Sequence, residues 1–197
     1  MGHRGLMARA LRCTVNGEVP RHFVELGAGD GKLMLRVARQ LAPRWPGLCL
    51  TLVDQQQLAT GQTRNGFAHL GWRLDCVQAD VFEWIQHIPH PADVMVANLF
   101  LHHFEDDRLT ELFRGVAQLT HTFIALEPRR SRFALAFSQQ IWAIGCNHVS
   151  RHDAPVSVRA GFAGQELSRL WPAQGSWSFD ERPVGLFSHL FIARRRK

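Results

Sequence analysis

The sequence predicts an α/β fold in which a mostly parallel sheet lies between two layers of helices. Short apolar runs of strand length alternate with segments whose apolar residues recur at steps of three and four. Such alternation is typical of parallel strands joined by crossover helices. The last two strand-like runs are separated by little more than a turn, whereas parallel neighbours need a crossover of a dozen or more residues. We therefore expect the closing pair to be antiparallel.

The elements follow one another in a regular order up to Pro128. Candidate parallel strands cover residues 22–26, 48–53, 72–79, 93–99 and 122–126. The helix-like segments between them cover residues 32–42, 57–70, 82–88 and 107–119. Gly61 and Gly66 weaken the second of these helices. Beyond Pro128 we expect a long apolar helix at 132–148, a turn-rich stretch, a short helix at 164–171 and closing strands at 176–183 and 185–195.

The composition favours a globular, unexported protein. The chain has 197 residues, 46% of them hydrophobic, which suits one α/β domain. No apolar run approaches the roughly 20 residues that a membrane-spanning helix needs. The first residues lack the apolar core of a signal peptide. We therefore predict a cytoplasmic protein without a membrane span.

Cysteine usage does not indicate a metal site or a disulfide framework. The four cysteines lie far apart and form no C-x-x-C pair. We expect reduced core thiols and no metal. The cysteines are Cys13, Cys49, Cys76 and Cys146.

Charge is distributed unevenly along the chain, whose net charge is +6. Residues 1–50 carry +5, residues 51–128 carry −6, and residues 129–197 carry +7, with histidine counted as neutral. The acidic centre holds most of the candidate ligand-binding residues. The basic flanks are scattered arginines with one terminal run, "RRRK", which we interpret as a solvated tail.

The stretch "HFVELGAGDGKLMLRVARQ" places three glycines at alternate positions between a strand and a helix. This spacing differs from the dinucleotide fingerprint G-x-G-x-x-G. Glycines there let the backbone approach a ligand where a Cβ would intrude. Glu25 precedes the glycines, Asp54 closes the second strand and Asp80 closes the third. Three acids around one site favour a cationic ligand and repel a polyphosphate.

Four segments in order carry a family resemblance: "ELGAGDG", "LVDQQ", "QADVF" and "NLFLHHF". They resemble successive motifs of the class I S-adenosylmethionine-dependent methyltransferases, and the closing hairpin is similar to that family's seventh strand. The resemblance covers residues 20–197. It implies a three-layer Rossmann-like methyltransferase fold, with a seven-stranded, mostly parallel sheet whose last strand is antiparallel. It also implies S-adenosyl-L-methionine as cofactor.

The resemblance assigns the first group of cofactor residues to the glycine junction. Gly27, Ala28 and Gly29 would line the methionine portion. Glu25 would hold its ammonium group directly or through water. Asp54 would accept hydrogen bonds from the ribose diol. From the residues alone, Asp54 could instead cap a helix.

The second group follows the next strands. Gln55 would border the adenine, and Asp80 with the backbone of Val81 would bind the adenine edge. Asn98 and Leu99 would face the sulfonium. The alternatives are a helix N-cap at Asp80 and a turn-forming role for Asn98.

His102 and His103 follow the fourth strand and are the candidate catalytic residues. A phenol with a pKa near 10 is only about 0.1% ionised at neutral pH, so a base that accepts its proton could contribute roughly 10²–10⁴-fold. The alternative is that one histidine packs or caps the next helix while the other is exposed to solvent.

The acceptor is predicted less directly. Asn98-Leu99-Phe100 is not the N-P-P-aromatic signature of methylases acting on base amines. We divide the chain into a 1–20 extension, a candidate partial lid, and a 21–197 methyltransferase domain with an acceptor-side insertion at about 128–176. This insertion contains aromatic and histidine residues suited to a flat, apolar small molecule. They are Trp142, His148, His152, Asp153 and Phe162.

The segment "RHDAPVSVRAGFAGQEL" resembles one in small bacterial methyltransferases encoded beside polyketide-type enzymes, with Arg159 and Glu166 at its recurring polar positions. We therefore predict methyl transfer to a small, phenolic or quinone-like acceptor in secondary metabolism. The alternatives are an RNA or protein methyltransferase and a non-catalytic cofactor-binding partner subunit. Nucleic acid is not the expected partner, and the sequence does not predict the oligomeric state.

Overall fold

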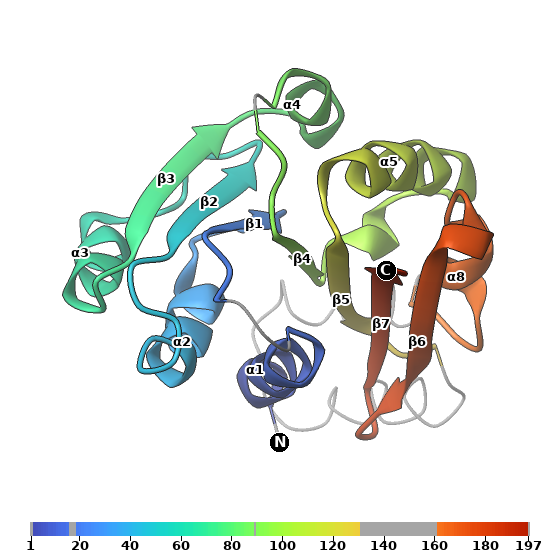
Figure 1. Cartoon of the computed structure of the whole chain (residues 1–197), viewed down its shortest axis with the longest axis horizontal. Helices are drawn as coiled ribbons and strands as arrows, with labels where there is room; N and C mark the ends of the chain where they lie inside the picture. The colour runs from blue at the N-terminus through green and yellow to red at the C-terminus, as the bar shows by residue number, and fades with distance from the viewer. Residues whose placement is uncertain (1, 16–18, 89, 131–160, 197) are drawn as a thin grey trace, which may run out of the picture.

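The computed structural model of the chain describes residues 2–15, 19–88, 90–130 and 161–196. These residues form a seven-stranded sheet in the order β3-β2-β1-β4-β5-β7-β6 (Figure 1). The strands are β1 (His22–Leu26), β2 (Cys49–Asp54), β3 (Arg73–Gln78), β4 (Val94–Asn98), β5 (Thr122–Pro128), β6 (Trp177–Val184) and β7 (Ser188–Arg195). The strands β1 to β5 are parallel, and β7 runs antiparallel to both β5 and β6. The predicted fold class and the antiparallel ending are confirmed.

Helices cover both faces of the sheet, as the alternating pattern predicts (Figure 1). One face carries α1 (His3–Thr14), α2 (Lys32–Leu41) and α3 (Gly61–His69). The other carries α4 (Val81–His87), α5 (Asp106–Leu119) and α8 (Glu166–Leu170). Each face has its own apolar core, so the sheet is buried on both sides. No helix in the described ranges has the length and apolar character needed to cross a bilayer.

The helix α3 begins later than the sequence predicts. Its first residue is Gly61, and the Thr60 hydroxyl caps it by accepting a hydrogen bond from the amide of Thr63 at 3.3 Å. The expectation that the helix starts at residue 57 is therefore wrong by four residues. A threonine N-cap followed by a glycine marks the true start, because a β-branched hydroxyl residue is better placed at a cap than inside a helix.

The N-terminal extension contains a helix that the sequence analysis did not identify. The side chains of Met7, Ala8 and Leu11 on α1 are fully buried against the core that α2 also builds. These positions follow a helical spacing, but the intervening arginines obscure it in the sequence. The helix α1 is thus part of the core. The prediction that residues 1–20 act as a partial lid remains a prediction.

The strand order places a switch point between β1 and β4. The strand β1 pairs with β2 on one side and with β4 on the other, so the chain reverses its direction of progress across the sheet there. Open parallel sheets bind ligands beyond the carboxyl ends of the strands at such a point. The glycine junction that follows β1 lies at this position.

Candidate functional site

A cavity of about 330 Å³ opens at the carboxyl ends of β1, β2 and β4. Its size falls in the range of small-molecule sites, about 300–1,000 Å³. Another hollow, of about 400 Å³, lies between α1 and the closing hairpin, and none of the predicted site residues lines it. The lining of the first cavity is Gly27, Val53, Asp54, Gln55, Gln56, Ala79, Val81, Leu99, Phe100, His103 and Phe104.

Gly27 and Gly29 of the bend differ in what surrounds them. Gly27 and Gly29 have φ values of 66° and 56°, in the left-handed region that glycine tolerates best. A Cβ on Gly27 would lie 2.1 Å from Cδ2 of Phe100, so a ring of the protein occupies this space. A Cβ on Gly29 would meet nothing within 4 Å. The open space that a ligand could use is therefore at Gly29, beside Ala28.

Asp54 is fixed by two backbone amides and lines the cavity. Its Oδ2 accepts a hydrogen bond from the amide of Gly29 at 2.8 Å, and its Oδ1 accepts one from the amide of Gln56 at 2.9 Å. Each carboxylate oxygen keeps a further lone pair for a ligand. Asp54 does not cap a helix, since α3 begins only at Gly61. The side chain is thus oriented before any ligand binds.

Glu25 is buried beneath the bend and is not satisfied by the protein. It is 2% exposed, and its Oε2 has no hydrogen-bond partner among the described residues. Burial, together with the nearby charges of Asp30 and Asp54, raises its pKa to about 8. A buried acid without a partner is costly, and a bound cation would offset that cost. The role of Glu25 as the ammonium site remains a prediction, and the unpartnered Oε2 is the atom that a cation could contact.

The structure gives Asp80 the helix-cap role that the sequence analysis left open, whereas its contact with the adenine edge remains a prediction. It is the N-cap of α4, and its Oδ1 accepts hydrogen bonds from the amides of Phe82 at 2.8 Å and Glu83 at 3.4 Å. Its Oδ2 accepts one from the side chain of Gln55 at 2.8 Å. Burial raises the pKa of Asp80, but these hydrogen bonds lower it more, and the net pKa is below its ordinary value. Val81 adjoins it in the cavity wall.

Asn98 and Leu99 end β4 in different ways. The side chain of Asn98 turns toward α1, where its Oδ1 lies 3.0 Å from Nδ1 of His3. Leu99 has a φ of 53°, is 43% exposed and lines the cavity. A left-handed conformation is uncommon for a leucine and suggests a functional constraint. Thus Leu99 lines the cavity, whereas Asn98, the residue before it, is not among the lining residues.

Glu127 is a site residue that the sequence analysis missed. It ends β5 next to β4, and its side chain is fully buried. Its Oε1 accepts hydrogen bonds from the amides of Phe100 at 2.9 Å and Leu101 at 3.0 Å. Its Oε2 lies 2.8 Å from Nδ1 of His102. This one carboxylate therefore fixes the whole turn that follows β4. Only its place after a buried strand hinted at this role.

The two histidines have separate environments. The His102 side chain is 6% exposed and pairs with Glu127, whereas His103 lines the cavity. The two rings are in contact, with centroids 4.2 Å apart and planes inclined by 36°. Partial burial and the neighbouring His102 lower the pKa of His103, against a smaller opposing effect of Glu127. The lowered pKa favours the neutral form of the His103 imidazole, which is the form that can accept a proton.

Aromatic rings form the apolar side of the cavity. Phe104 makes edge-to-face contacts with Phe82 and Phe100, at centroid distances of 5.3 Å and 5.0 Å. The guanidinium of Arg108 lies 3.5 Å above the ring of Phe82 and closes the cluster from outside. The sequence analysis did not single out Phe100 or Phe104 as site residues.

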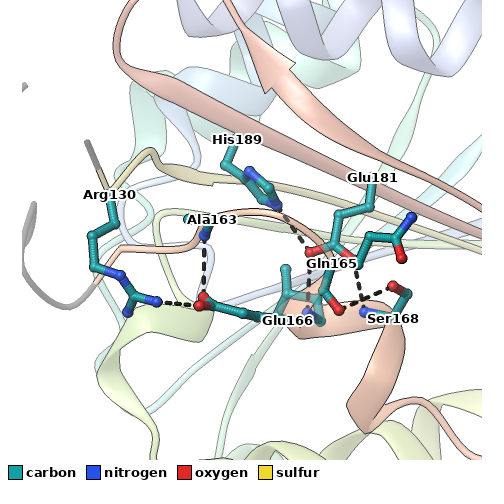
Figure 2. Close-up of polar contacts among 8 residues, drawn as sticks. Arg130, Ala163, Gln165, Glu166, Ser168, Glu181 and His189 are labelled. Carbon is teal, nitrogen blue, oxygen red and sulfur yellow. Dashed lines mark hydrogen bonds and ion pairs between the residues drawn. The ribbon is translucent and has the colours of Figure 1, made fainter. Parts of the chain in front are cut away.

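The residues on either side of 131–160 are joined by hydrogen bonds (Figure 2). The amide of Phe162 donates to the carbonyl of Pro128, and the amide of Arg130 donates to the carbonyl of Phe162, both at 2.9 Å. Arg130 also forms an ion pair with Glu166, which accepts a hydrogen bond from the amide of Ala163 at 3.1 Å. Phe162 is a buried core residue, and Glu166 has a structural partner.

A second glutamate–histidine pair holds α8 against the hairpin (Figure 2). Glu181 accepts hydrogen bonds from the amides of Leu167 at 3.0 Å and Ser168 at 2.8 Å, and lies 2.9 Å from Nε2 of His189. Burial raises the pKa of Glu181, but these hydrogen bonds lower it below its ordinary value. His189 pairs in register with Glu127 on β5. The two glutamate–histidine pairs therefore share one face of the sheet.

Several predicted residues lie outside the described ranges: Trp142, His148, His152, Asp153, Arg159 and Cys146, with the helix expected at 132–148. Within those ranges, Cys13, Cys49 and Cys76 are free thiols. No group of three or more His, Cys, Asp or Glu side chains there could hold a metal ion.

Comparison with known proteins places the chain among methyltransferases. The profile of a family described as "Methyltransferase domain" matches residues 23–122, just over half of the chain. Trans-aconitate 2-methyltransferase of Mycolicibacterium gilvum (strain PYR-GCK) is 33% identical over 102 residues. That alignment covers 51% of this chain, and the chain spans only 34% of the curated relative.

Solved structures share the fold at low sequence identity. The plantazolicin methyltransferase BpumL, in complex with a monoazolic desmethylPZN analog and SAH, has a TM-score of 0.67 and 13% identity, with 98% of this chain and 84% of that chain covered. Magnesium protoporphyrin IX methyltransferase from Synechocystis PCC 6803 with bound SAH has a TM-score of 0.64 at 13% identity, covering 98% and 82%. The mitomycin 7-O-methyltransferase MmcR has a TM-score of 0.62 at 19% identity, covering 100% and 55%.

The matched family profile covers the chain from β1 to the start of β5. The same part of the chain forms the cavity at the switch point and carries the acids around it. The chain belongs to the methyltransferase domain family.

Proposed function

We propose that the protein is an S-adenosylmethionine-dependent methyltransferase that acts on a small, phenolic or quinone-like acceptor in secondary metabolism. The observation that carries the proposal is the cavity at the end of β1, with an oriented carboxylate, Asp54, in its wall and a buried glutamate, Glu25, whose Oε2 has no partner among the described residues, two positions before Gly27. Such an arrangement suits a ligand that has both a cationic and a hydroxyl-bearing part. When bound, S-adenosylmethionine supplies an electrophilic methyl group on a sulfonium.

The positions of the acids support one orientation of the cofactor. Glu25 would hold the ammonium group below the open space at Gly29. Asp54, whose two oxygens each keep a lone pair, would bind the ribose hydroxyls. Gln55, Asp80 and Val81 continue the wall on the side where the adenine would lie. The structural relatives solved with SAH, the demethylated product, support this cofactor.

The acceptor side consists of apolar rings and one neutral imidazole. Phe100 and Phe104 give it flat apolar surface, and His103 lines it with a lowered pKa. Transfer requires the acceptor oxygen, the methyl carbon and the sulfur to be in line, and such alignment can supply about 7–11 kcal/mol of the barrier. In the proposed reaction His103 accepts the hydroxyl proton, while Glu127 holds His102 and the turn in place. The mitomycin and porphyrin names of two structural relatives support an aromatic acceptor.

The cofactor assignment is tested by Asp54→Ala. We expect the affinity for S-adenosylmethionine, measured by calorimetry, to fall by about 1–3 kcal/mol because a charged hydrogen-bonding partner is lost. Asp75→Ala is the matched control, since Asp75 is an exposed carboxylate on β3 and does not line the cavity. Equal affinities of wild type and Asp54→Ala would show that Asp54 does not bind the cofactor.

One surface favours an RNA methyltransferase as a second candidate. The helices α1 and α2 carry no acidic residue, and five arginines on them form no salt bridge within the described part of the chain. They line a shallow hollow between the two helices. Filter binding to single-stranded RNA over a range of salt would decide. Neutralisation of Z phosphates gives a log–log slope of about −0.7Z, so a steep slope favours RNA and a shallow one favours the small acceptor. The arginines are Arg4, Arg9, Arg12, Arg36 and Arg39.

A further inference from the structure

The imidazole of His3 joins three segments that are distant in the sequence. Its Nδ1 lies 3.0 Å from Oδ1 of Asn98, and its Nε2 lies 3.2 Å from Oγ of Ser188. Both ring nitrogens therefore have a partner, one at the end of β4 and one at the start of β7. Because the serine hydroxyl can donate or accept, the bridge can form in either protonation state of the imidazole.

Packing of α1 against the core fixes the position of His3. Met7 and Leu11, one and two turns further along α1, are fully buried. Ser188 is 5% exposed and pairs with Pro128 of β5. The helix itself has no side-chain cap and no acid in its first turn. Among the described residues, the side-chain hydrogen bonds of the first turn of α1 are these two contacts of His3.

Asn98 is the partner that adjoins two residues lining the cavity, Gly27 and Leu99. The register pairs Leu26 of β1 with Ala97 of β4, so the next positions, Gly27 and Asn98, adjoin each other. Leu99 follows with its left-handed backbone and lines the cavity. The terminal torsion of an asparagine is broad, so only a hydrogen bond decides which way its amide points. In this structure the contact to His3 supplies that bond.

We infer that His3 is a positioning residue of the cofactor site: its Nδ1–H holds Oδ1 of Asn98 and thereby orients the Asn98 amide group beside the cavity-lining residue Leu99. The inference rests on the proposed function, since it concerns binding of the S-adenosyl ligand. It assigns to the N-terminal helix a direct effect on ligand affinity, beyond its contribution to the core. His3 itself does not line the cavity.

A merely structural role and a positioning role make different predictions for two conservative variants. An asparagine at position 3 can place its amide nitrogen near the position of Nδ1 and keep the bond to Asn98. A glutamine reaches instead to the position of Nε2 and keeps the bond to Ser188. If His3 only holds α1 in place, either of its two contacts is sufficient. If His3 positions Asn98, the contact made by Nδ1 is required.

The experiment is a calorimetric titration with SAH of wild type, His3→Ala, His3→Asn and His3→Gln, with thermal unfolding of each variant as a check on folding. We expect His3→Ala and His3→Gln to weaken SAH binding about fivefold to tenfold, as the loss of one hydrogen bond does. His3→Asn should stay within about twofold of wild type. The control is Cys13→Ala, an exposed position in the last turn of α1, which should bind as wild type does.

A double-mutant cycle tests whether His3 acts through Asn98. In the Asn98→Ala background, His3→Ala should cause no further loss of affinity. Additive losses, or a His3→Gln variant that binds as tightly as wild type, would overturn the inference. Failure of the wild-type chain to bind SAH would instead overturn the proposed function, so the two failures are distinguishable.

Discussion

A single buried carboxylate organises the reacting side of the site. Glu127 accepts hydrogen bonds from the amides of Phe100 and Leu101 and pairs with His102. The ring of His103 lies tilted against that of His102, and His103 lines the cavity. The proposed base is therefore held indirectly, through its neighbour. In the proposed reaction the buried histidine is the support and the exposed one is the proton acceptor.

The residue-scale prediction concerns His103. For a phenolic acceptor, His103→Ala should lower turnover at pH 7 by roughly 10²-fold, because general-base assistance is lost. Part of the rate should return near pH 10, where a phenol ionises without help. Turnover measured from pH 6 to pH 10 checks both effects. The control is His87→Ala, since the His87 ring only bonds a carbonyl of its own helix at 2.8 Å. Full activity of both His102→Ala and His103→Ala at pH 7 would contradict proton transfer by these residues.

Among single residues, the sequence analysis singled out those that stand next to a strand end or a glycine motif, and it missed those whose contacts are made only by the fold. Asp54 and Asp80 each follow a strand directly, and Glu25 precedes the glycines, so their shared location could be predicted from topology. The contact between His3 and Asn98 spans 95 residues, and no local pattern indicates it. The role of Glu127 likewise depends on how β5 lies beside β4.

Close helix packing on the outer layer depends on a glycine. Gly115 of α5 faces Ile85 of α4, and a Cβ there would lie 2.2 Å from Cγ2 of that isoleucine. A β-branched side chain has few alternative rotamers in a helix, so Ile85 cannot move aside easily. The helix α4 begins at the Asp80 cap, so this packing also supports one wall of the cavity.

The element-scale prediction compares two glycine substitutions. Gly115→Ala gains about 1 kcal/mol of helix propensity but costs about 1–3 kcal/mol in overpacking, so we expect a lower free energy of unfolding. Gly61→Ala is the control, because a Cβ there meets nothing within 4 Å. It should leave stability unchanged or raise it by less than about 1 kcal/mol. Urea unfolding of both variants gives the comparison. A Gly115→Ala protein at least as stable as Gly61→Ala would show that α4 and α5 are not closely packed.

The boundaries of the helices and strands were predicted with different accuracy. The strands were predicted within one or two residues, except that β7 begins three residues later than expected, because most of them are apolar runs bounded by turn residues. The helix α1 was missed, since arginines alternate with its three fully buried residues. The start of α3 was misplaced because the cap at Thr60 stands within a polar stretch that resembles a helix.

Across the whole molecule, the cost of ionising the buried Glu25 carboxyl group should appear in the pH dependence of stability. The pKa of Glu25 is raised to about 8 from an ordinary value of 4.5. Between these values the folded chain binds more protons than the unfolded chain, so stability falls as the pH rises. The maximal slope for one group is about 1.4 kcal/mol per pH unit.

The prediction is that the free energy of unfolding of wild type declines from pH 6 to pH 8, and that Glu25→Gln removes most of this decline. A neutral amide does not titrate, so no proton is lost on unfolding at that position. Urea unfolding at pH 6, 7 and 8 checks the slopes of both proteins. Parallel slopes for wild type and Glu25→Gln would contradict a raised pKa at Glu25. The substituted chain should be the more stable at pH 8 and the poorer binder of the cofactor.

The account depends on a cationic ligand that binds above Glu25. The most direct measurement is calorimetric titration with S-adenosylmethionine at pH 6.5 in two buffers of different ionisation enthalpy. A carboxyl group with a pKa of about 8 is protonated at that pH, and a bound ammonium group lowers the pKa, so about one proton should be released per ligand. Glu25→Gln should bind more weakly and release none. Absence of binding, or binding by wild type without proton release, would contradict the account.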